Sequence, residues 1–336
     1  MRALIMVGPG GSERSEVREV EVPRPGRGEV TVDVACAGLN FMDVMARRGD
    51  AGYASAWPYR PGLEIAGTIR ELGDGVTQFA VGDRVAAVTS SGGGLAEVAT
   101  APANLTIAVP EGVPAATAAA TPLGLATALL LLSDAGRFAP DETVLVHSAS
   151  GGIGTAVAKL VPLLGGGRLI GTVGRPEKAD AARKAGYDVV LPRGEATADS
   201  LRAANGGQGI DVVLDPLGTT ALALDLDVAA TGARVVLFGN AGGGALDALP
   251  PAGRLIGGNI SVTGFSHRGL VAGAPHRVAA AIAKALALVA EGNLEVPVTE
   301  LVDLADVPAT HDLMAQGQGA GKYVVGLGRD AFPGRK

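Results

Sequence analysis

The rhythm of apolar and polar positions changes near residue 117. Before it, short runs alternate between apolar and polar side chains, as at 29–35, 63–72 and 83–88, and glycine- and proline-containing turns separate them. Alternation with a period of two is typical of strands that bury one face. The first part of the chain is therefore predicted to be a β-rich, distorted barrel.

After residue 117, nearly continuous apolar strands alternate with helical patterns. This alternation favours an α/β fold with a doubly wound parallel sheet that helices cover on both faces. The predicted strands lie at 143–147, 168–173, 188–191, 211–215, 234–239 and 261–265, and the predicted helices at 155–164, 177–186, 197–204 and 219–230.

The carboxyl-terminal pattern is too short to form a domain of its own. A long helix at 275–291 and short strands near 298–301 and 323–327 follow the sheet. We expect these elements to complete the first domain. The chain then has two domains, as its length allows: 1–116 with 266–336, and 117–265.

A glycine-rich turn, Ala149-Ser-Gly-Gly-Ile-Gly154, follows the first strand of the predicted sheet. Backbone N–H groups and the helix dipole at such a turn can hold a pyrophosphate. Against the pattern G-x-G-x-x-G the first glycine is Ala149, and a chain with 51 glycines shows such spacings by chance. An ordinary turn is the alternative for these residues alone, but their place in the sheet favours a dinucleotide. The candidate contacts are Ser150, Gly151, Gly152, Ile153 and Gly154.

The end of the second predicted strand indicates which dinucleotide binds. NAD sites place Asp or Glu there, whereas NADP sites need positive charge for the 2′-phosphate. Here the strand ends at Gly174, Arg175 and Lys178 lie within reach, and Arg193 adds a third cation. We therefore predict NADPH. Solvated charges at a helix start are the alternative for the first two cations, and Glu177 argues against NADPH, although an acid in a first helical turn suits the helix dipole.

Composition narrows the possible partners. A net charge of −6 and an aromatic content of 3% disfavour nucleic acid. The single cysteine, Cys36, excludes an intramolecular disulfide and a multi-cysteine zinc cluster. The uncharged segment 113–132 is about long enough to span a bilayer, but Pro122 and Gly124 interrupt it. We expect a buried helix pair there, and a soluble, cytoplasmic protein without a membrane partner.

Several motifs, in their order and spacing, resemble the medium-chain dehydrogenase/reductase superfamily, specifically its zinc-independent quinone oxidoreductase and enoyl reductase branch. The resemblance runs over nearly the whole chain and implies a GroES-like barrel domain together with a Rossmann domain. Besides the glycine-rich turn, the motifs are Gly38-Leu-Asn-Phe-Met-Asp43, Pro61-Gly-Leu-Glu-Ile-Ala-Gly67, Val81-Gly-Asp-Arg-Val85, Asp215-Pro-Leu-Gly218 and Gly321-Lys322.

Departures from the zinc alcohol dehydrogenases are equally informative. Asn40 stands where those enzymes carry a metal-binding cysteine, and Leu63 replaces the histidine of their Gly-His-Glu motif. The histidines of this chain show no ligand-like spacing. We expect no metal.

The resemblance also implies the site residues. The expected catalytic residues are Asn40, near the nicotinamide ribose, and Tyr53, a donor to the substrate oxygen. Tyr59 is the alternative to Tyr53, because the loop 50–59 departs from the family in length, and packing is the alternative for both tyrosines. Thr127 would touch the nicotinamide amide or, alternatively, bond to the preceding turn. Asp43 is expected to brace the loop of Asn40. Further implied cofactor contacts are Gly174, Phe238, Gly239, Asn240, Phe265, Ser266 and Lys322.

Without a metal to polarise a carbonyl, the hydride acceptor must delocalise charge itself. A small quinone or α,β-unsaturated carbonyl does so, and this predicts an NADPH-dependent oxidoreductase, with a homodimer through the last parallel strand expected from the family. An acyl-carrier or CoA enoyl-thioester reductase of fatty acid or polyketide metabolism is the alternative, with Arg47, Arg48 and Arg60 as phosphate-binding candidates. A third hypothesis is an NADPH-binding structural or regulatory protein with little turnover.

Overall fold

The computed structural model describes residues 1–54, 56–89 and 92–328, which form two compact units. The first unit comprises Met1–Thr127 and the chain from His267 on, and the second comprises Ala128–Ser266. The boundary expected at 116 lies instead after Thr127, because helix α2 (Ala115–Ala119) and the following turn pack against strands of the first unit. Residues 329–336 of the expected first domain lie outside the described residues.

A six-stranded parallel sheet organises the second unit. Its strand order is β10-β9-β8-β11-β12-β13. Counted from β8, the first strand of this sheet, the order reproduces the doubly wound arrangement 3-2-1-4-5-6. The predicted doubly wound sheet is therefore confirmed. The strands are β8 (Val144–His147), β9 (Leu169–Val173), β10 (Val189–Pro192), β11 (Ile210–Asp215), β12 (Ala229–Leu237) and β13 (Ser261–Gly264).

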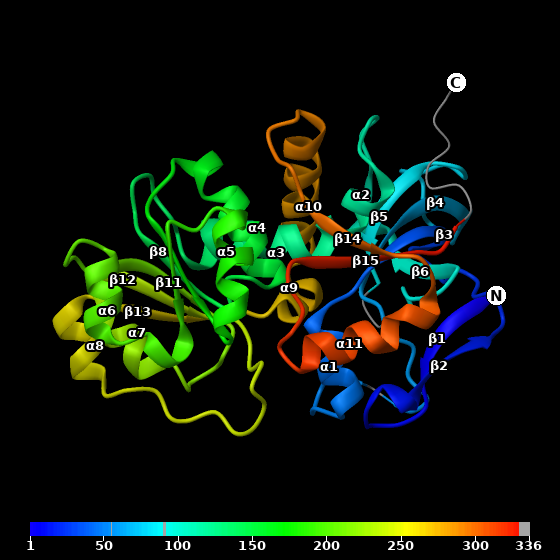
Figure 1. Cartoon of the computed structure of the whole chain (residues 1–336). Coiled ribbons are helices and arrows are strands. Elements are labelled where there is room, and N and C mark those ends of the chain that lie inside the picture. The colour runs from blue at the N-terminus through cyan, green and yellow to red at the C-terminus, as the bar shows by residue number, and fades with distance from the viewer. Residues whose placement is uncertain (55, 90–91, 329–336) are drawn as a thin grey trace. The chain divides into compact units, whose positions relative to one another are not determined.

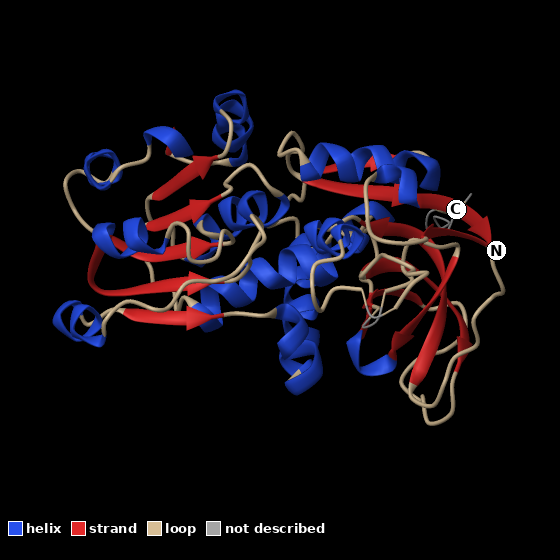
Figure 2. Cartoon of the chain, turned by 90° about the horizontal axis from the view of Figure 1, so that it is seen from below, coloured by secondary structure: helices blue, strands red, loops and turns tan. Residues whose placement is uncertain are grey.

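Helices connect these strands, and Figure 2 shows them beside a layer of parallel arrows. Every residue of β8 and β9 is buried, as a sheet that helices cover on both faces requires. Leu145, Ile170 and Val213 contribute to the core of this unit. The helices are α4 (Gly152–Leu160), α5 (Ala179–Ala185), α6 (Ala198–Ala204), α7 (Leu222–Val228) and α8 (Ala252–Gly258).

A mostly antiparallel sheet forms the first unit, in the order β14-β15-β3-β4-β5-β7, with β6 paired to β3. The red strand β15 lies beside the blue strand β3 in Figure 1, so the carboxyl end of the chain completes this sheet. The strands are β3 (Glu29–Gly38), β4 (Glu64–Leu72), β5 (Arg84–Val88), β6 (Val98–Pro102), β7 (Thr106–Ala108), β14 (Val298–Leu301) and β15 (Lys322–Gly326), and β1 (Arg2–Met6) pairs with β2 (Ser15–Glu19).

The uncharged segment 113–132 contains two short buried helices, as expected, but they are joined by further helical turns. Helix α2 is followed by η3 (Thr121–Leu125), α3 (Ala126–Leu130) and η4 (Leu131–Ala135), and the wider turn η3 accommodates Pro122 and Gly124. In the described part of the chain, no helix has both the length and the apolar character that crossing a membrane requires. From Ala128 on, α3 and η4 belong to the second unit. Besides α2, the α-helices of the first unit are α1 (Phe41–Arg48), α9 (His267–Gly273), α10 (Pro275–Ala290) and α11 (Val307–Ala315).

Candidate active site

The glycine-rich turn connects β8 to α4 at the carboxyl edge of the parallel sheet. Gly151 is the N-cap of α4, and no side chain among the described residues caps this helix. A Cβ at Gly154 would lie 2.4 Å from the carbonyl oxygen of Ala149, so a larger residue would push the helix away from the strand. The uncapped N–H groups and the helix dipole favour an anion at this turn.

The replacement of the first motif glycine by Ala149 has a structural compensation. Ala149 is buried, and a Cβ at Gly171 of the neighbouring strand β9 would lie 2.5 Å from its methyl group. The missing side chain on β9 therefore provides the space that the motif glycine usually provides. The turn keeps its geometry despite the departure.

Three cations gather beside this turn. Arg193 donates from Nη2 to the Ser148 hydroxyl at 3.3 Å, and a Cβ at Gly174 would lie 3.7 Å from its guanidinium nitrogens. Burial lowers the pKa of Lys178, and the charges of Arg175 and Arg193 lower it further. Mutual repulsion among three cations is unfavourable unless an anion joins them. We call Arg175, Lys178 and Arg193 the cation cluster.

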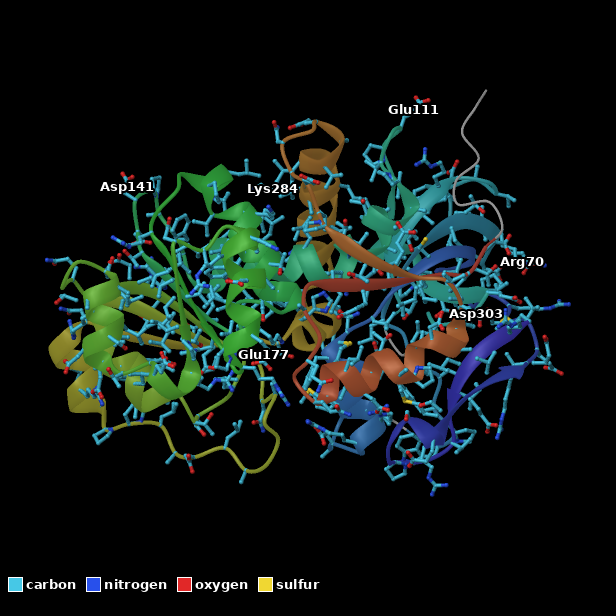
Figure 3. The ribbon with its side chains drawn as sticks, in the orientation of Figure 1. Arg70, Glu111, Asp141, Glu177, Lys284 and Asp303 are labelled. Carbon is cyan, nitrogen blue, oxygen red and sulfur yellow. The ribbon has the colours of Figure 1, made fainter. Side chains whose placement is uncertain are left out.

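Glu177 does not take the place of an NAD-selecting carboxylate. Its side chain, labelled in Figure 3, is 66% exposed and lies 3.7 Å from Arg175, which is 45% exposed. An exposed ion pair of this length contributes little free energy. Glu177 is therefore a weak competitor with a ligand phosphate for Arg175.

The other predicted contacts of the second unit lie at the same sheet edge. Phe238, Gly239 and Asn240 follow β12, and Phe265 and Ser266 follow β13. The Phe265 N–H donates to the Leu237 carbonyl at 2.9 Å, and the Asn240 amide donates to Gly244 at 2.9 Å. The carboxyl edge of a doubly wound sheet is where such folds bind ligands. The structure thus brings these residues to one edge with the glycine-rich turn.

In the first unit, Asn40 belongs to a buried polar cluster with Glu64 and Lys322. The Lys322 ammonium donates to Asn40 Oδ1 at 2.8 Å, to the Leu39 carbonyl at 2.8 Å and to Glu64 Oε1. The Asn40 amide also donates to Glu64 Oε1 at 3.0 Å. Glu64 Oε2 accepts from the Leu123 N–H at 2.7 Å. The cluster fixes the Asn40 side chain at the N-cap of α1.

The role of Glu64 in this cluster was not evident from the sequence. Its side chain is fully buried, and its partner is Lys322. An ammonium group has three N–H donors, and those of Lys322 match the three acceptors. A contact between Lys322 and the cofactor would therefore replace one of these bonds.

Asp43 braces the loop of Asn40, as predicted. Its Oδ2 accepts from the Asn40 N–H at 2.9 Å, and its Oδ1 accepts from the Gly62 N–H at 3.0 Å. Burial raises the pKa of Asp43 to about 6, and these two bonds oppose the rise. The carboxyl thus ties the start of α1 to the segment before β4.

The two candidate tyrosines differ in burial. Tyr59 is 8% exposed, exchanges backbone hydrogen bonds with Met6 at 2.9 and 2.8 Å, and has a pKa that burial raises to about 12. Tyr53 is half-buried, and burial also raises its pKa. Arg268 lies near both tyrosines, and its charge lowers the pKa of each. The sequence did not reveal this cation. The exposure favours Tyr53 as the residue that reaches a ligand.

Thr127 and His267 each have a buried polar atom without a protein partner. The hydroxyl of Thr127, a residue 5% exposed, has no hydrogen-bond partner among the described residues, which contradicts a bond to the preceding turn. His267 bonds to the Pro122 backbone, but its Nε2 also has no partner among those residues. Burial lowers the pKa of His267 to about 4, so the ring is neutral near pH 7. Both atoms are suited to bind a ligand.

Metal ligands are not grouped in the described ranges 1–54, 56–89 and 92–328, where no set of three or more His, Cys, Asp and Glu side chains is arranged to hold an ion. His147 is buried and hydrogen-bonded to Thr172 and Asp225. The expectation that no metal binds stays a prediction.

Family models match both units. Residues 26–111 match the alcohol dehydrogenase GroES-like domain, and residues 152–287 match the zinc-binding dehydrogenase family. The second match includes the glycines of the turn from Gly152 on. The predicted combination of a GroES-like domain and a Rossmann sheet is confirmed.

Individual relatives have the same architecture. The chain is 34% identical to quinone oxidoreductase of Rattus norvegicus over 241 residues, covering 71% of this chain and 73% of that one. It is 30% identical to the human synaptic vesicle membrane protein VAT-1 homolog over 343 residues, covering 97% and 86%. The crystal structure of Escherichia coli quinone oxidoreductase complexed with NADPH matches with a TM-score of 0.87 at 28% identity, covering 97% and 100%.

Proposed function

Because the chain belongs to the medium-chain dehydrogenase/reductase superfamily, in its zinc-independent quinone oxidoreductase branch, we propose that it reduces quinones or α,β-unsaturated carbonyls with NADPH. Membership of this family makes the chain an oxidoreductase. The choice of NADPH as cofactor and of a quinone or α,β-unsaturated carbonyl as acceptor is our proposal. The observation that carries the choice of NADPH is the cation cluster beside the glycine-rich turn. The NADPH in the Escherichia coli relative supports it.

The second unit would hold the phosphates. The N–H groups at the start of α4 suit a pyrophosphate, and Arg175, Lys178 and Arg193 suit the 2′-phosphate. The mutual repulsion in the cation cluster is relieved when a phosphate binds, so these residues discriminate NADPH from NADH. When bound, the reduced nicotinamide supplies the hydride.

The first unit would supply the groups that orient the nicotinamide and the substrate. Asn40 Oδ1 accepts from Lys322 and keeps a second lone pair, which suits a ribose hydroxyl. The unpartnered Thr127 hydroxyl suits the nicotinamide amide. Tyr53 would donate a proton or a hydrogen bond to the substrate oxygen.

The acceptor class follows from what these side chains can stabilise. Asn40 and Leu63 stand at two metal-ligand positions of the zinc enzymes and cannot supply cysteine or histidine ligands. Hydrogen-bond donors alone stabilise negative charge best when the acceptor already delocalises it, as a quinone or an enone does. This favours conjugate reduction over reduction of an isolated ketone.

The enoyl-thioester alternative has less support from the proposed basic residues. Arg47 is 3% exposed and donates to Asp312 Oδ1 at 2.7 Å, and Arg48 forms an ion pair with Asp50. Of the three candidates, only Arg60 is exposed and has no ion pair with another described residue. Arg47 therefore cannot serve as a surface phosphate ligand. The hypothesis of an NADPH-binding protein with little turnover is tested by the assay below.

The test is a substrate panel with NADPH oxidation as the readout. Quinones, small enones and enoyl thioesters are compared at equal concentration, with and without exhaustive chelation. We expect turnover of quinones or enones that chelation leaves unchanged. Turnover of enoyl thioesters alone would contradict the acceptor class, a chelator-sensitive rate would contradict the metal-free chemistry, and binding without oxidation would contradict catalysis.

The proposed assembly is a homodimer through β13, which ends the six-stranded sheet. Strand β13 is also the last strand of this parallel sheet in chain order. A cytoplasmic location is proposed with it. Sedimentation of the purified chain measures the oligomeric state directly.

A further inference from the structure

A serine in the left-handed backbone conformation directly precedes the glycine-rich turn. Ser148 follows β8 and has a φ of 59°. A residue with a Cβ is strained in this region, whereas glycine adopts it freely. Strained residues of this kind persist where the surrounding structure holds them, and they are concentrated at functional sites. The serine side chain is therefore a candidate for a role that glycine could not fill.

Hydrogen bonds on both sides of Ser148 hold it in this conformation. The Gly151 N–H donates to the Ser148 carbonyl at 2.9 Å. The preceding residue, His147, is 2% exposed, and both of its ring nitrogens are engaged. Nδ1 lies 2.7 Å from the Thr172 hydroxyl oxygen, and Nε2 lies 2.8 Å from Asp225 Oδ1. These contacts fix the direction in which the Ser148 side chain points.

The Ser148 hydroxyl contacts the end of a long side chain that comes from two strands away. Arg193 follows β10, and β9 lies between β10 and β8 in the sheet. Neighbouring strands are about 4.8 Å apart, so this side chain must reach across roughly 10 Å. Its Nη2 donates to the Ser148 hydroxyl at 3.3 Å. After β9 it lies beside Gly174, where a Cβ would be 3.7 Å from both Nη atoms. Two contacts thus place the guanidinium at the ends of β8 and β9.

This placement matters because Arg193 is exposed. An exposed arginine occupies many rotamers and loses that freedom when it binds a phosphate. A hydroxyl that holds the guanidinium before the ligand arrives reduces the loss, which is the general effect of preorganisation. NADH has no 2′-phosphate, so a group that acts through Arg193 affects NADPH alone.

We propose that Ser148 is a positioning residue for Arg193 and thereby contributes to the discrimination of NADPH from NADH. This inference rests on the proposed function. The left-handed backbone of Ser148 directs the hydroxyl toward the guanidinium, and the guanidinium meets the 2′-phosphate. The backbone strain at Ser148 is retained because a glycine, which would relieve it, has no oxygen to hold Arg193.

Isothermal titration calorimetry of the whole chain with NADPH and with NADH tests the proposal without a reaction. Ser148→Gly removes the hydroxyl and the strain together. We expect the Kd for NADPH to rise about 3- to 10-fold, the value of one hydrogen bond, while the Kd for NADH and the melting temperature stay close to those of wild type. Ser148→Asn tolerates the left-handed region and keeps a side-chain acceptor, so it should restore most of the NADPH affinity.

The matched control changes a left-handed residue elsewhere in the same unit. Asp141, labelled in Figure 3, has a φ of 66°, is exposed and precedes β8, at the opposite end of that strand from Ser148. Asp141→Gly should leave both Kd values unchanged.

A double-variant cycle shows whether Ser148 acts through Arg193. Arg193→Gln should weaken NADPH binding by on the order of 10-fold or more, the value of a charged hydrogen bond. Adding Ser148→Gly to it should cause little further loss, because the partner of the hydroxyl is already absent. If Ser148→Gly does not fold, Ser148→Ala takes its place in the cycle.

The outcomes separate this inference from the proposed function. An unchanged Kd for NADPH in Ser148→Gly, equal losses with NADPH and NADH, or additive losses in the double variant would overturn the inference alone. No NADPH binding by the wild-type chain, or binding no tighter than that of NADH, overturns the proposed choice of cofactor and the inference with it.

Discussion

At the scale of single residues, two buried atoms without protein partners among the described residues are candidate ligand contacts. A buried polar group that lacks a hydrogen bond costs about 1–3 kcal/mol. The hydroxyl of Thr127 and Nε2 of His267 are such atoms in the described chain. A ligand that bonds to them would recover part of this free energy. This is the main reason to assign Thr127 to the nicotinamide amide rather than to packing.

Thr127→Val tests this assignment, because valine keeps the shape and removes the hydroxyl. We expect the KM for NADPH to rise about 2- to 10-fold, the value of one neutral hydrogen bond, while the melting temperature stays the same or rises. Thr127→Ser should retain the wild-type KM. A wild-type KM in Thr127→Val would show that the hydroxyl only packs.

The sequence indicates where a residue lies when its position after a strand decides its location. Arg175 and Lys178 follow a strand of recognisable pattern, so their nearness to the glycine-rich turn could be inferred. The partner of Glu64 could not, because Lys322 reaches it only through the pairing of β15 with β3. The unpartnered atom of His267 was likewise hidden, since burial depends on how distant segments pack.

At the scale of elements, the Glu64–Lys322 pair connects the beginning of β4 to the beginning of β15. Both side chains are almost completely buried. A buried charge that loses its partner is strongly unfavourable. Loss of one partner would therefore weaken the attachment of β15 to the first unit.

Lys322→Met leaves the Glu64 carboxylate buried without its cation. We expect the free energy of unfolding, measured by urea denaturation, to fall by about 3–5 kcal/mol. The double variant Glu64→Gln, Lys322→Met should recover part of this loss. A single variant that loses less than about 1 kcal/mol, as an exposed pair would, would refute the importance of burial.

The first turn of helix α4 packs closely against the backbone of the glycine-rich turn. Gly154→Ala would place a Cβ 2.4 Å from the Ala149 carbonyl oxygen. The helix must then move, so we expect NADPH affinity to fall by on the order of 10-fold or more, since 1.4 kcal/mol corresponds to tenfold. The matched control is Gly257→Ala in α8, where a Cβ meets open space. Equal affinities, measured by fluorescence titration, would contradict the proposed role of the turn.

The sequence predicted the second-unit strands because parallel strands read as nearly continuous apolar runs. It missed α1, α8, α9 and α11. For α11 a signal was present: Asp303 caps the turn before the helix, with Asp306 completing a capping box, and Pro308 stands in the first turn. Helix α8 contains three glycines in seven residues, and this low helix propensity concealed it in the sequence.

At the scale of the whole molecule, each unit has its own core and its own share of the proposed chemistry. The second unit gathers the cations and the glycine-rich turn, and the first gathers Asn40, Tyr53 and Thr127. Buried titratable groups occur in both units, so the stability of the molecule must depend on pH.

His311 should contribute acid sensitivity. It is fully buried, and burial lowers its pKa to about 3, below the usual value of 6.5. Between these values the unfolded chain binds a proton that the folded chain does not, so the folded state loses stability as the pH falls below 6.5. Asp43 and Asp215, whose pKa values are raised, act in the opposite direction.

A difference measurement isolates this contribution. From pH 6.5 down toward 4, His311→Leu should gain stability relative to wild type by up to ~1.4 kcal/mol per pH unit. Chemical denaturation across this range measures it, with His276→Leu at an exposed position as the control. Parallel pH profiles for wild type and His311→Leu would contradict the prediction.

The choice of NADPH by the cation cluster is tested most directly by one measurement. The measurement compares the wild type with the double variant Arg175→Ala, Lys178→Ala. For each, kcat/KM is determined for NADPH and for NADH with the best quinone or enone acceptor. Arg183→Ala, an exposed cation on α5 paired with Asp180, is the control. The double variant should lose on the order of 100-fold with NADPH, the value of two charged hydrogen bonds, and little with NADH. An equal loss with both cofactors, or none, would contradict the account.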